Sequence, residues 1–169
     1  MKRFIFSLLA CGLVVVAQPA AAVELKPFDE NSLAALKREQ AGRPFVLVLW
    51  SVTCVPCREE LRLWNAWSNR YPAIKVVLVS TDPPQDHAAA QHMAERYADA
   101  SADPRAFASD YAERLRWSID PAWHGDVPRT YFFDAAHHAA PKSGLVDAAY
   151  VEAWLAKNSS TTKSTKGTR

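Results

Sequence analysis

The feature that most constrains this chain is its alternation of short apolar runs with longer amphipathic stretches. The run RPFVLVLWS (43–51) is rich in β-branched residues and too short for a buried helix, so it predicts a strand covered on both faces. Residues 57–71 follow, with Leu61, Trp64 and Trp67 at helical spacing and charged residues between them. That pattern is typical of an amphipathic helix packed on a sheet.

The rest of the chain continues this alternation. Further strands are expected at 73–82 and 125–134, a short one at 105–110 and an edge strand within 135–146; further helices are expected at 29–41, 85–100, 109–117 and 147–157. We expect Asn31 or Ser32 to cap the first helix, Gly42 to end it and Ser109 to cap the helix at 109–117. In the last helix, Ala148, Val151, Trp154 and Leu155 share one side. This order predicts an α/β fold with a central mixed β-sheet flanked by helices.

Both ends of the chain are expected to lie outside this fold. Lys2 and Arg3 precede an apolar run at 4–17, and small residues follow up to Ala22. This arrangement is typical of a signal peptide covering 1–22, which predicts export to the periplasm with cleavage near Ala22. Acylation of Cys11 as a lipoprotein is a less favoured alternative. Residues 158–169 contain almost only Ser, Thr, Lys and other polar residues, so we expect a disordered tail after a single domain at 23–157.

The net charge and the number of cysteines exclude some classes of function. The formal net charge of +2 equals the contribution of Lys2 and Arg3, and the remaining basic residues are scattered along the sequence, so a nucleic-acid partner is not expected. Removing 1–22 leaves Cys54 and Cys57 as the only cysteines. A disulfide across two residues closes too short a loop to stabilise a fold appreciably, which favours a reactive pair over a structural one.

The CxxC pair lies between the strand at 43–51 and the helix that begins near Cys57. A cysteine at a helix N-terminus faces unpaired N–H groups and the positive end of the helix dipole, and such thiols reach a pKa of about 3.5–7.5. We therefore expect Cys54 to attack a substrate disulfide and the more buried Cys57 to resolve the mixed disulfide. Pro56 suits the first turn, where its missing N–H is not needed. Trp50 is expected to pack beneath this loop.

A second feature is the dipeptide Val127–Pro128, directly before the strand residues TYFFD. A proline at the start of a buried strand lacks a donor for the ladder, so it indicates a structural role. We expect a cis peptide bond here. It would turn the backbone of Val127 toward an extended substrate and keep metals away from the sulfurs.

The motifs WSVTCVPC (50–57) and VPRT (127–130) resemble the thioredoxin superfamily, and residues 28–156 as a whole are similar to exported TlpA/ResA-like thiol–disulfide oxidoreductases. The resemblance implies attacking and resolving roles for Cys54 and Cys57, a cis-proline at Pro128 and an active-site carboxylate at Glu60. It also implies protein thiol or disulfide substrates and a membrane reductase as electron donor. Such proteins often serve cytochrome c maturation or copper-oxidase assembly, and that role is the expectation here. We also expect no cofactor, no metal site and a monomeric chain.

The sequence departs from that pattern in several places. Thr53 replaces a tryptophan that commonly precedes the first cysteine, and Val48 occupies the position where thioredoxin keeps a buried aspartate. Proton transfer would then fall to Glu60 or to water, unless Glu60 is only an exposed first-turn residue. The segment 118–126 is long for the family, and its Trp123 and His124 either line a substrate groove or cover the edge of the core.

Two other functions use the same residues. Cys54 and Cys57 could supply ligands for copper delivery or, less readily, for zinc, completed by a histidine among His87, His92, His124, His137 and His138. The spacing of these histidines favours solvent exposure for all five. A peroxiredoxin-like peroxidase would use Thr53 and Arg129 around the attacking cysteine. No histidine stands between the cysteines, as it does in strongly oxidising members of the superfamily, which favours a reductant.

Overall fold

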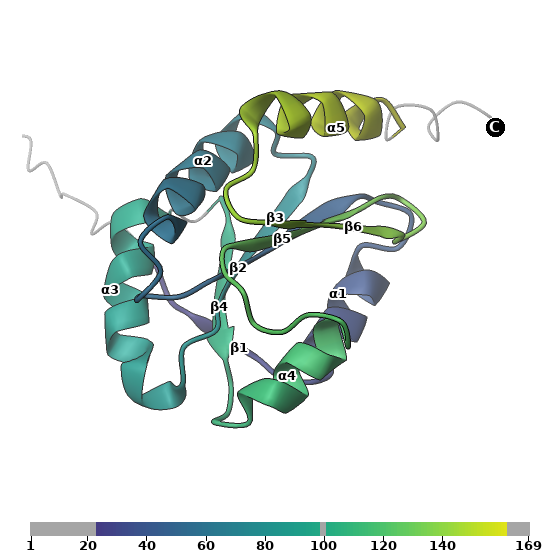
Figure 1. Cartoon of the computed structure of the whole chain (residues 1–169). Helices are drawn as coiled ribbons and strands as arrows, with labels where there is room; N and C mark the ends of the chain where they lie inside the picture. The colour runs from purple at the N-terminus through teal and green to yellow at the C-terminus, as the bar shows by residue number, and fades with distance from the viewer. Residues whose placement is uncertain (1–22, 99–100, 162–169) are drawn as a thin grey trace, which may run out of the picture.

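The computed structural model describes residues 23–98 and 101–161 (Figure 1). Its strands are β1 (Lys26–Phe28), β2 (Phe45–Trp50), β3 (Lys75–Ser80), β4 (Asp103–Phe107), β5 (Arg129–Phe133) and β6 (Ala139–Ser143). Its helices are α1 (Ser32–Glu39), α2 (Cys57–Arg70), α3 (His87–Tyr97), α4 (Ala112–Ile119) and α5 (Ala148–Thr161), with a 3-10 turn η1 (Pro84–Asp86) before α3. No helix within the described residues is long and apolar enough to cross a membrane.

The six strands form one mixed sheet in the order β1-β4-β3-β2-β5-β6. β1, β4, β3 and β2 run parallel to one another, whereas β5 pairs antiparallel with β2 and β6 pairs antiparallel with β5. Strand β2 is therefore central, and all six of its residues are buried. The predicted α/β class with a central mixed sheet is confirmed.

Alternate residues of β2 point into two different cores. Val46, Val48 and Trp50 belong to a cluster with buried residues of α2, α3 and α5, while Leu47 and Leu49 belong to a second cluster with residues of α1 and α4. Figure 1 shows the same division, with α2, α3 and α5 on one side of the sheet and α1 and α4 on the other. The uninterrupted apolar run at 43–51 is explained by this double coverage.

Several predicted boundaries are wrong. The short strand β1 was not expected, because Phe28 is its only fully buried residue. β4 begins at Asp103 rather than at residue 105; Asp103 pairs with β3, and pairing with β1 begins at Arg105. α5 continues to Thr161, so the first residues of the expected tail at 158–169 are helical, and the Asn158 side chain donates to Trp154 O at 2.8 Å. The expected signal peptide at 1–22 and residues 162–169 lie outside the described residues.

The predicted helix caps also need correction. The expected cap at Asn31 makes no side-chain capping bond; instead the Asp29 carboxylate accepts from Asn31 N at 3.0 Å and Ser32 Oγ at 2.7 Å. Ser109 does not cap α4, which starts after Tyr111. Gly42 does follow the end of α1, with φ of 71°, a left-handed conformation that glycine adopts without strain. In α5, Ala148 is exposed rather than on the buried side.

Candidate active site

Cys54 and Cys57 form a disulfide with a Cα–Cα distance of 5.3 Å. Cys57 is the first residue of α2 and is completely buried, whereas Cys54 lies in the loop before it and is 9% exposed. Between them Val55 is 72% exposed and forms the tip of the loop. Cys57 is thus the more buried of the two, as expected. Pro56 stands one position before the first helical residue rather than inside the first turn.

The loop that leads to Cys54 is held by a buried carboxylate, Asp82, just after β3. Ser51 Oγ donates to Asp82 Oδ1 at 2.6 Å, and Val52 N donates to Oδ2 at 3.0 Å. Ser80 Oγ also donates to Oδ2, at 2.7 Å. Sequence reasoning missed Asp82. It could have been found from its position just after a strand that runs parallel to β2, because residues at the carboxyl ends of parallel strands lie close to the loop that follows the neighbouring strand.

Thr53, which stands where the family commonly has tryptophan, is exposed and joins this network through Ser51. The two hydroxyl oxygens, Thr53 Oγ1 and Ser51 Oγ, lie 3.0 Å apart. The Cys54 N–H donates to Ser51 O at 3.2 Å. The backbone of the attacking position is therefore tied to Asp82 through Ser51.

Glu60 is completely buried one helical turn after Cys57, which corrects the alternative of an exposed first-turn residue. Its carboxylate accepts three hydrogen bonds: from Trp64 Nε1 at 2.7 Å, from Thr130 Oγ1 at 3.0 Å and from Val146 N at 3.2 Å. These donors come from α2, from β5 and from the segment before α5. The carboxylate thus links α2 and the segment before α5 to strand β5 of the sheet.

The Glu60 carboxyl also lies near Val48, the residue at the position where thioredoxin has a buried aspartate. Thr130 pairs with Val48 across the β2–β5 ladder, so the hydroxyl that donates to Glu60 is beside that residue. Burial raises the pKa of Glu60 above its ordinary value, and the hydrogen bonds from Trp64, Val146 and Thr130 oppose that rise. A carboxyl with a raised pKa in this place can hold a proton nearer to neutral pH than an exposed glutamate can.

Trp50 belongs to the same buried cluster as Cys54 and Cys57. Its side chain is completely buried at the end of β2. The indole Nε1 is one of three buried side-chain nitrogens that have no hydrogen-bond partner among the described residues. The indole therefore contributes packing rather than a polar contact to the cysteine pair.

The Val127–Pro128 peptide bond is cis, as expected. Pro128 is buried and Val127 is half-buried. Pro128 O accepts from Gly144 N at 2.9 Å, which joins the proline to the turn after β6. Val127 packs against both hydrophobic clusters.

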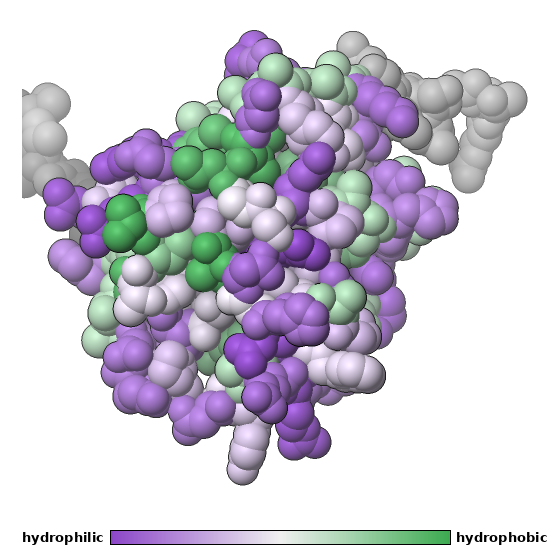
Figure 2. All heavy atoms as spheres, in the orientation of Figure 1, coloured by the Kyte–Doolittle hydropathy of each residue, from purple (hydrophilic) through white to green (hydrophobic). Residues whose placement is uncertain are grey.

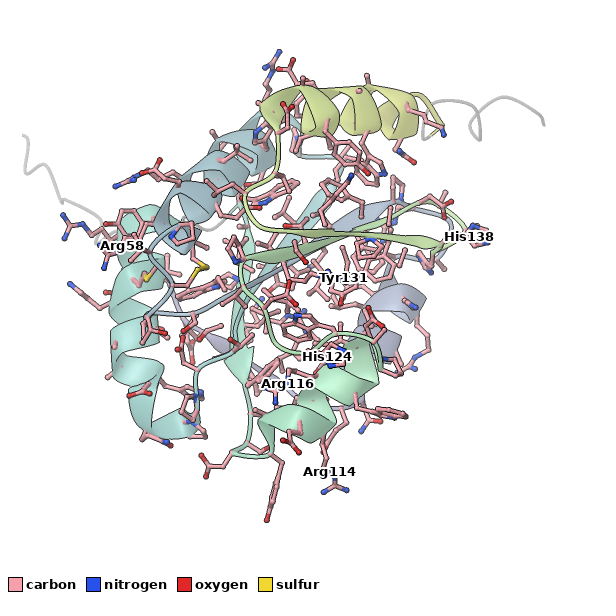
Figure 3. All side chains as sticks on the ribbon, viewed as in Figure 1. Arg58, Arg114, Arg116, His124, Tyr131 and His138 are labelled. Atoms are coloured by element: carbon pink, nitrogen blue, oxygen red, sulfur yellow. A yellow bond between two sulfur atoms is a disulfide. The ribbon has the colours of Figure 1, made fainter. Side chains whose placement is uncertain are left out.

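The long segment before Val127 covers the core. Trp123 is 4% exposed, packs in the cluster with α1 and α4, and donates from Nε1 to Asp126 O at 2.9 Å. His124 is exposed (labelled in Figure 3). Gly125 has φ of 97°, and a Cβ there would lie 3.2 Å from the Arg116 side chain, so this bend requires glycine. Of the two alternatives, Trp123 therefore covers the core rather than lining a groove.

Arg129, the candidate peroxidase arginine, is engaged elsewhere. Its guanidinium nitrogens lie 2.5 Å from Ser143 Oγ, 3.6 Å from Asp120 Oδ2 and 3.9 Å from Asp126 Oδ2. The guanidinium also sits 5.1 Å from the Tyr131 ring centroid. These contacts hold the segment before the cis-proline and give no support to a role of Arg129 beside Cys54.

The histidines are not all exposed, contrary to expectation. A ring nitrogen of His87 lies 3.0 Å from Phe107 O, and one of His137 lies 3.0 Å from Gln40 O, and both residues are half-buried. His92, His124 and His138 are exposed. Within the described part of the chain, no three His, Cys, Asp or Glu side chains are grouped so as to hold a metal ion.

The structure is similar to solved thiol–disulfide oxidoreductases. The dsbF protein of MTB superposes with a TM-score of 0.59 at 16% sequence identity, covering 71% of this chain and 84% of that one. A putative thiol:disulfide interchange protein DsbE from Chlorobium tepidum gives a TM-score of 0.57 at 16% identity, covering 72% and 83%. A secreted Mycobacterium tuberculosis disulfide oxidoreductase, described as homologous to E. coli DsbE, gives 0.56 at 18%, covering 71% and 85%.

By sequence, the chain matches no protein-family model and no curated protein. The identities to the solved structures establish a shared fold, and the local geometry adds a CxxC disulfide at the start of α2 and a cis-proline before β5. The chain therefore has the thioredoxin-like fold that its motifs predict, with a CxxC pair at the junction of β2 and α2.

Proposed function

We propose that this protein is an exported thiol–disulfide oxidoreductase that reduces disulfides in protein substrates. The observation that carries the proposal is the disulfide at the start of α2, in which Cys54 keeps 9% of its surface exposed and Cys57 is completely buried, with the buried carboxyl of Glu60 one turn further on. A structural disulfide gains nothing from such asymmetry, whereas a reaction with separate attacking and resolving steps requires it.

In the reduced protein, the Cys54 thiolate attacks one sulfur of the substrate disulfide. The substrate S–S bond breaks, a mixed disulfide with Cys54 forms, and the departing substrate thiolate takes up a proton. Cys57 then loses its proton and attacks Cys54 Sγ, which releases the second substrate thiolate. The Cys54–Cys57 disulfide forms, so two electrons pass from the dithiol to the substrate, Cys57 gives up its single proton, and the released substrate thiolates take up protons from the solvent.

Glu60 is the proposed acceptor for the Cys57 proton. Cys57 and Glu60 are three residues apart on α2, so their side chains share one face of the helix, and both are completely buried. The raised pKa of Glu60 reduces the cost of taking a proton from a thiol. Val48, in the position of thioredoxin's aspartate, cannot do so.

The remaining assignments follow the resemblance to TlpA/ResA-like proteins. Val127 and Pro128 are proposed to contact the substrate, and Trp50 and Pro56 to support the cysteine loop. The dithiol would be regenerated by a membrane reductase, and a substrate in cytochrome c maturation or copper-oxidase assembly fits a reductant in an oxidising compartment. Export through residues 1–22 is tested by sequencing the N-terminus of the mature protein, which should begin near Val23.

The deciding experiment is a titration of the purified protein against glutathione or dithiothreitol to obtain its reduction potential. A reversible couple at about −230 mV or lower supports a reductant, and a value near about −120 mV reverses the direction of electron flow. Cys57→Ser should accumulate a mixed disulfide with a substrate, whereas Cys54→Ser should not reduce insulin at all. Insulin reduction by the Cys54→Ser protein would refute the proposed chemistry.

A further inference from the structure

We propose that a groove between the start of α2 and α3 binds an acidic segment of the protein with which Cys54 exchanges disulfides; this rests on the proposed function. The groove has a volume of about 370 Å³. Its floor is apolar, formed by Val52, Met93 and Tyr97, and its rim is basic, formed by Arg58, His92 and Arg96. These residues come from three separate stretches of the sequence.

The groove adjoins the disulfide. Arg58 directly follows Cys57, Val52 precedes Cys54 by two residues, and Met93 belongs to the same buried cluster as both cysteines. Figure 3 labels Arg58 on the side of the molecule where α2 and α3 lie. In Figure 2, hydrophobic surface is concentrated over α2 and its neighbourhood, whereas the surface over α4 is mostly hydrophilic. A partner that reaches Cys54 therefore passes over or beside this groove.

The positive charge of the rim is not neutralised by the protein itself. Arg58 and Arg96 are exposed and have no ion-pair partner among the described residues. The guanidinium groups of Arg62 and Arg96 lie 4.6 Å and 5.7 Å from the Tyr97 ring centroid, which holds both beside the groove.

Two nearby acids are already engaged. Glu59 pairs with Arg62 at 2.6 Å, and Glu95 accepts from Gln91 Nε2 at 2.9 Å. The groove thus presents the guanidinium groups of Arg58 and Arg96 to an incoming chain.

The apolar floor and the guanidinium groups at the rim indicate which kind of peptide segment the groove can bind. Guanidinium groups bind carboxylates through paired N–H donors, and an apolar floor accepts a side chain from an extended backbone. An extended peptide with Asp or Glu beside an apolar residue satisfies both. Because Lys2 and Arg3 account for the formal net charge of +2, the rest of the protein is neutral and this attraction is local to the groove.

The test uses three oxidised peptides with the same disulfide loop and a flanking segment that is acidic, neutral or basic. The protein is reduced with a dithiol, and the rate constant for peptide reduction is measured at about 0.1 M and 1 M salt, where the Debye length is about 10 Å and 3 Å. We expect the acidic peptide to react about 5- to 10-fold faster than the basic one at low salt, and less than about twofold faster at high salt.

Arg96→Glu is the informative variant, because Arg96 lies on α3 away from the cysteine pair, whereas a change at Arg58 would alter the site itself. It should slow reduction of the acidic peptide about fivefold without changing the neutral peptide's rate or the reduction potential. Arg114→Glu is the control of equal charge, since this 71% exposed arginine lies on α4 (Figure 3).

Equal rates for acidic and basic peptides, or equal losses in the Arg96 and Arg114 variants, would overturn the groove assignment. So would an Arg96-dependent preference for oxidised glutathione over the acidic peptide, because the groove would then serve a small-molecule disulfide with several carboxylates. Failure to reduce even the neutral peptide would instead refute the proposed function.

Discussion

Replacing Glu60 by glutamine tests the buried carboxylate most directly. Trp64 Nε1 and Val146 N can only donate, and both point at Glu60, as does the hydroxyl of Thr130. An amide has one oxygen to offer, so in either orientation its NH₂ group faces one of the two N–H donors. One buried donor is then left unsatisfied, at a cost of about 1–3 kcal/mol, while the Thr130 hydroxyl can rotate.

The expected loss is about 3–10 °C in melting temperature for a domain of this size. It should be largest at low pH, because burial raises the pKa of Glu60 in the folded protein above its ordinary value of 4.5. The stability contributed by such a group is complete below the unfolded pKa and is lost as pH rises through the folded pKa. Glutamine does not titrate, so the gap between the two proteins should narrow from pH 5 to pH 8.

The assay is thermal unfolding of the oxidised protein at pH 5 and pH 8, followed by tryptophan fluorescence. Glu59→Gln is the matched control, because Glu59 is on the same turn but its side chain is 67% exposed and pairs only with Arg62. An exposed pair of this kind contributes about 0–1 kcal/mol. Equal melting temperatures for the two variants, or a gap that widens toward pH 8, would refute the argument about Glu60.

Three further outcomes follow from the same contacts. Reduction should raise tryptophan fluorescence through Trp50, and Trp50→Phe should abolish that change; a full change in the variant would contradict the placement of this indole. Asp82→Asn replaces the hydrogen bonds that Ser51, Val52 and Ser80 donate to a carboxylate by weaker bonds to a neutral amide, so urea unfolding should show a loss of about 1–3 kcal/mol. Burial raises the pKa of Asp103, but hydrogen bonds from Arg105, Lys26 and Lys75 outweigh it and hold this pKa well below its ordinary value of 3.8. The Asp103 carboxylate therefore stabilises the folded protein at pH values above 3.8. Asp103→Asn should therefore destabilise the protein by about 1–3 kcal/mol at pH 7, and the difference should shrink as pH falls below 4.

The central strands and the cysteine pair were predictable because each has a strong local signal. The apolar run before Cys54 and the helical spacing of Leu61, Trp64 and Trp67 indicate a strand and an amphipathic helix without reference to any distant residue. The same holds for Val127–Pro128, where a proline directly precedes a buried strand. Short elements with weak patterns were missed or misplaced: β1 has only Phe28 fully buried, and the ends of β4 depend on two neighbouring strands.

The role of Glu60 shows why the rest required the structure. The family resemblance singles out Glu60, but the sequence leaves open whether its side chain is exposed like that of Glu59; in the structure, α2 begins at Cys57 and turns Glu60 inward. Its partners Thr130 and Val146 are 70 and 86 residues away. They reach it because β5 lies against β2 in the sheet and the chain crosses back over α2 before α5.

The sequence by itself determined the alternation of strands and helices and the chemistry of the CxxC pair, because side-chain periodicity and cysteine spacing act over a few residues. The tertiary structure decided which charged groups meet. Asp82 reaches the loop before Cys54 because β3 is parallel to β2 and ends beside it. Arg58 and Arg96 line one groove because α2 and α3 pack on the same face of the sheet, a long-range arrangement that no local pattern encodes.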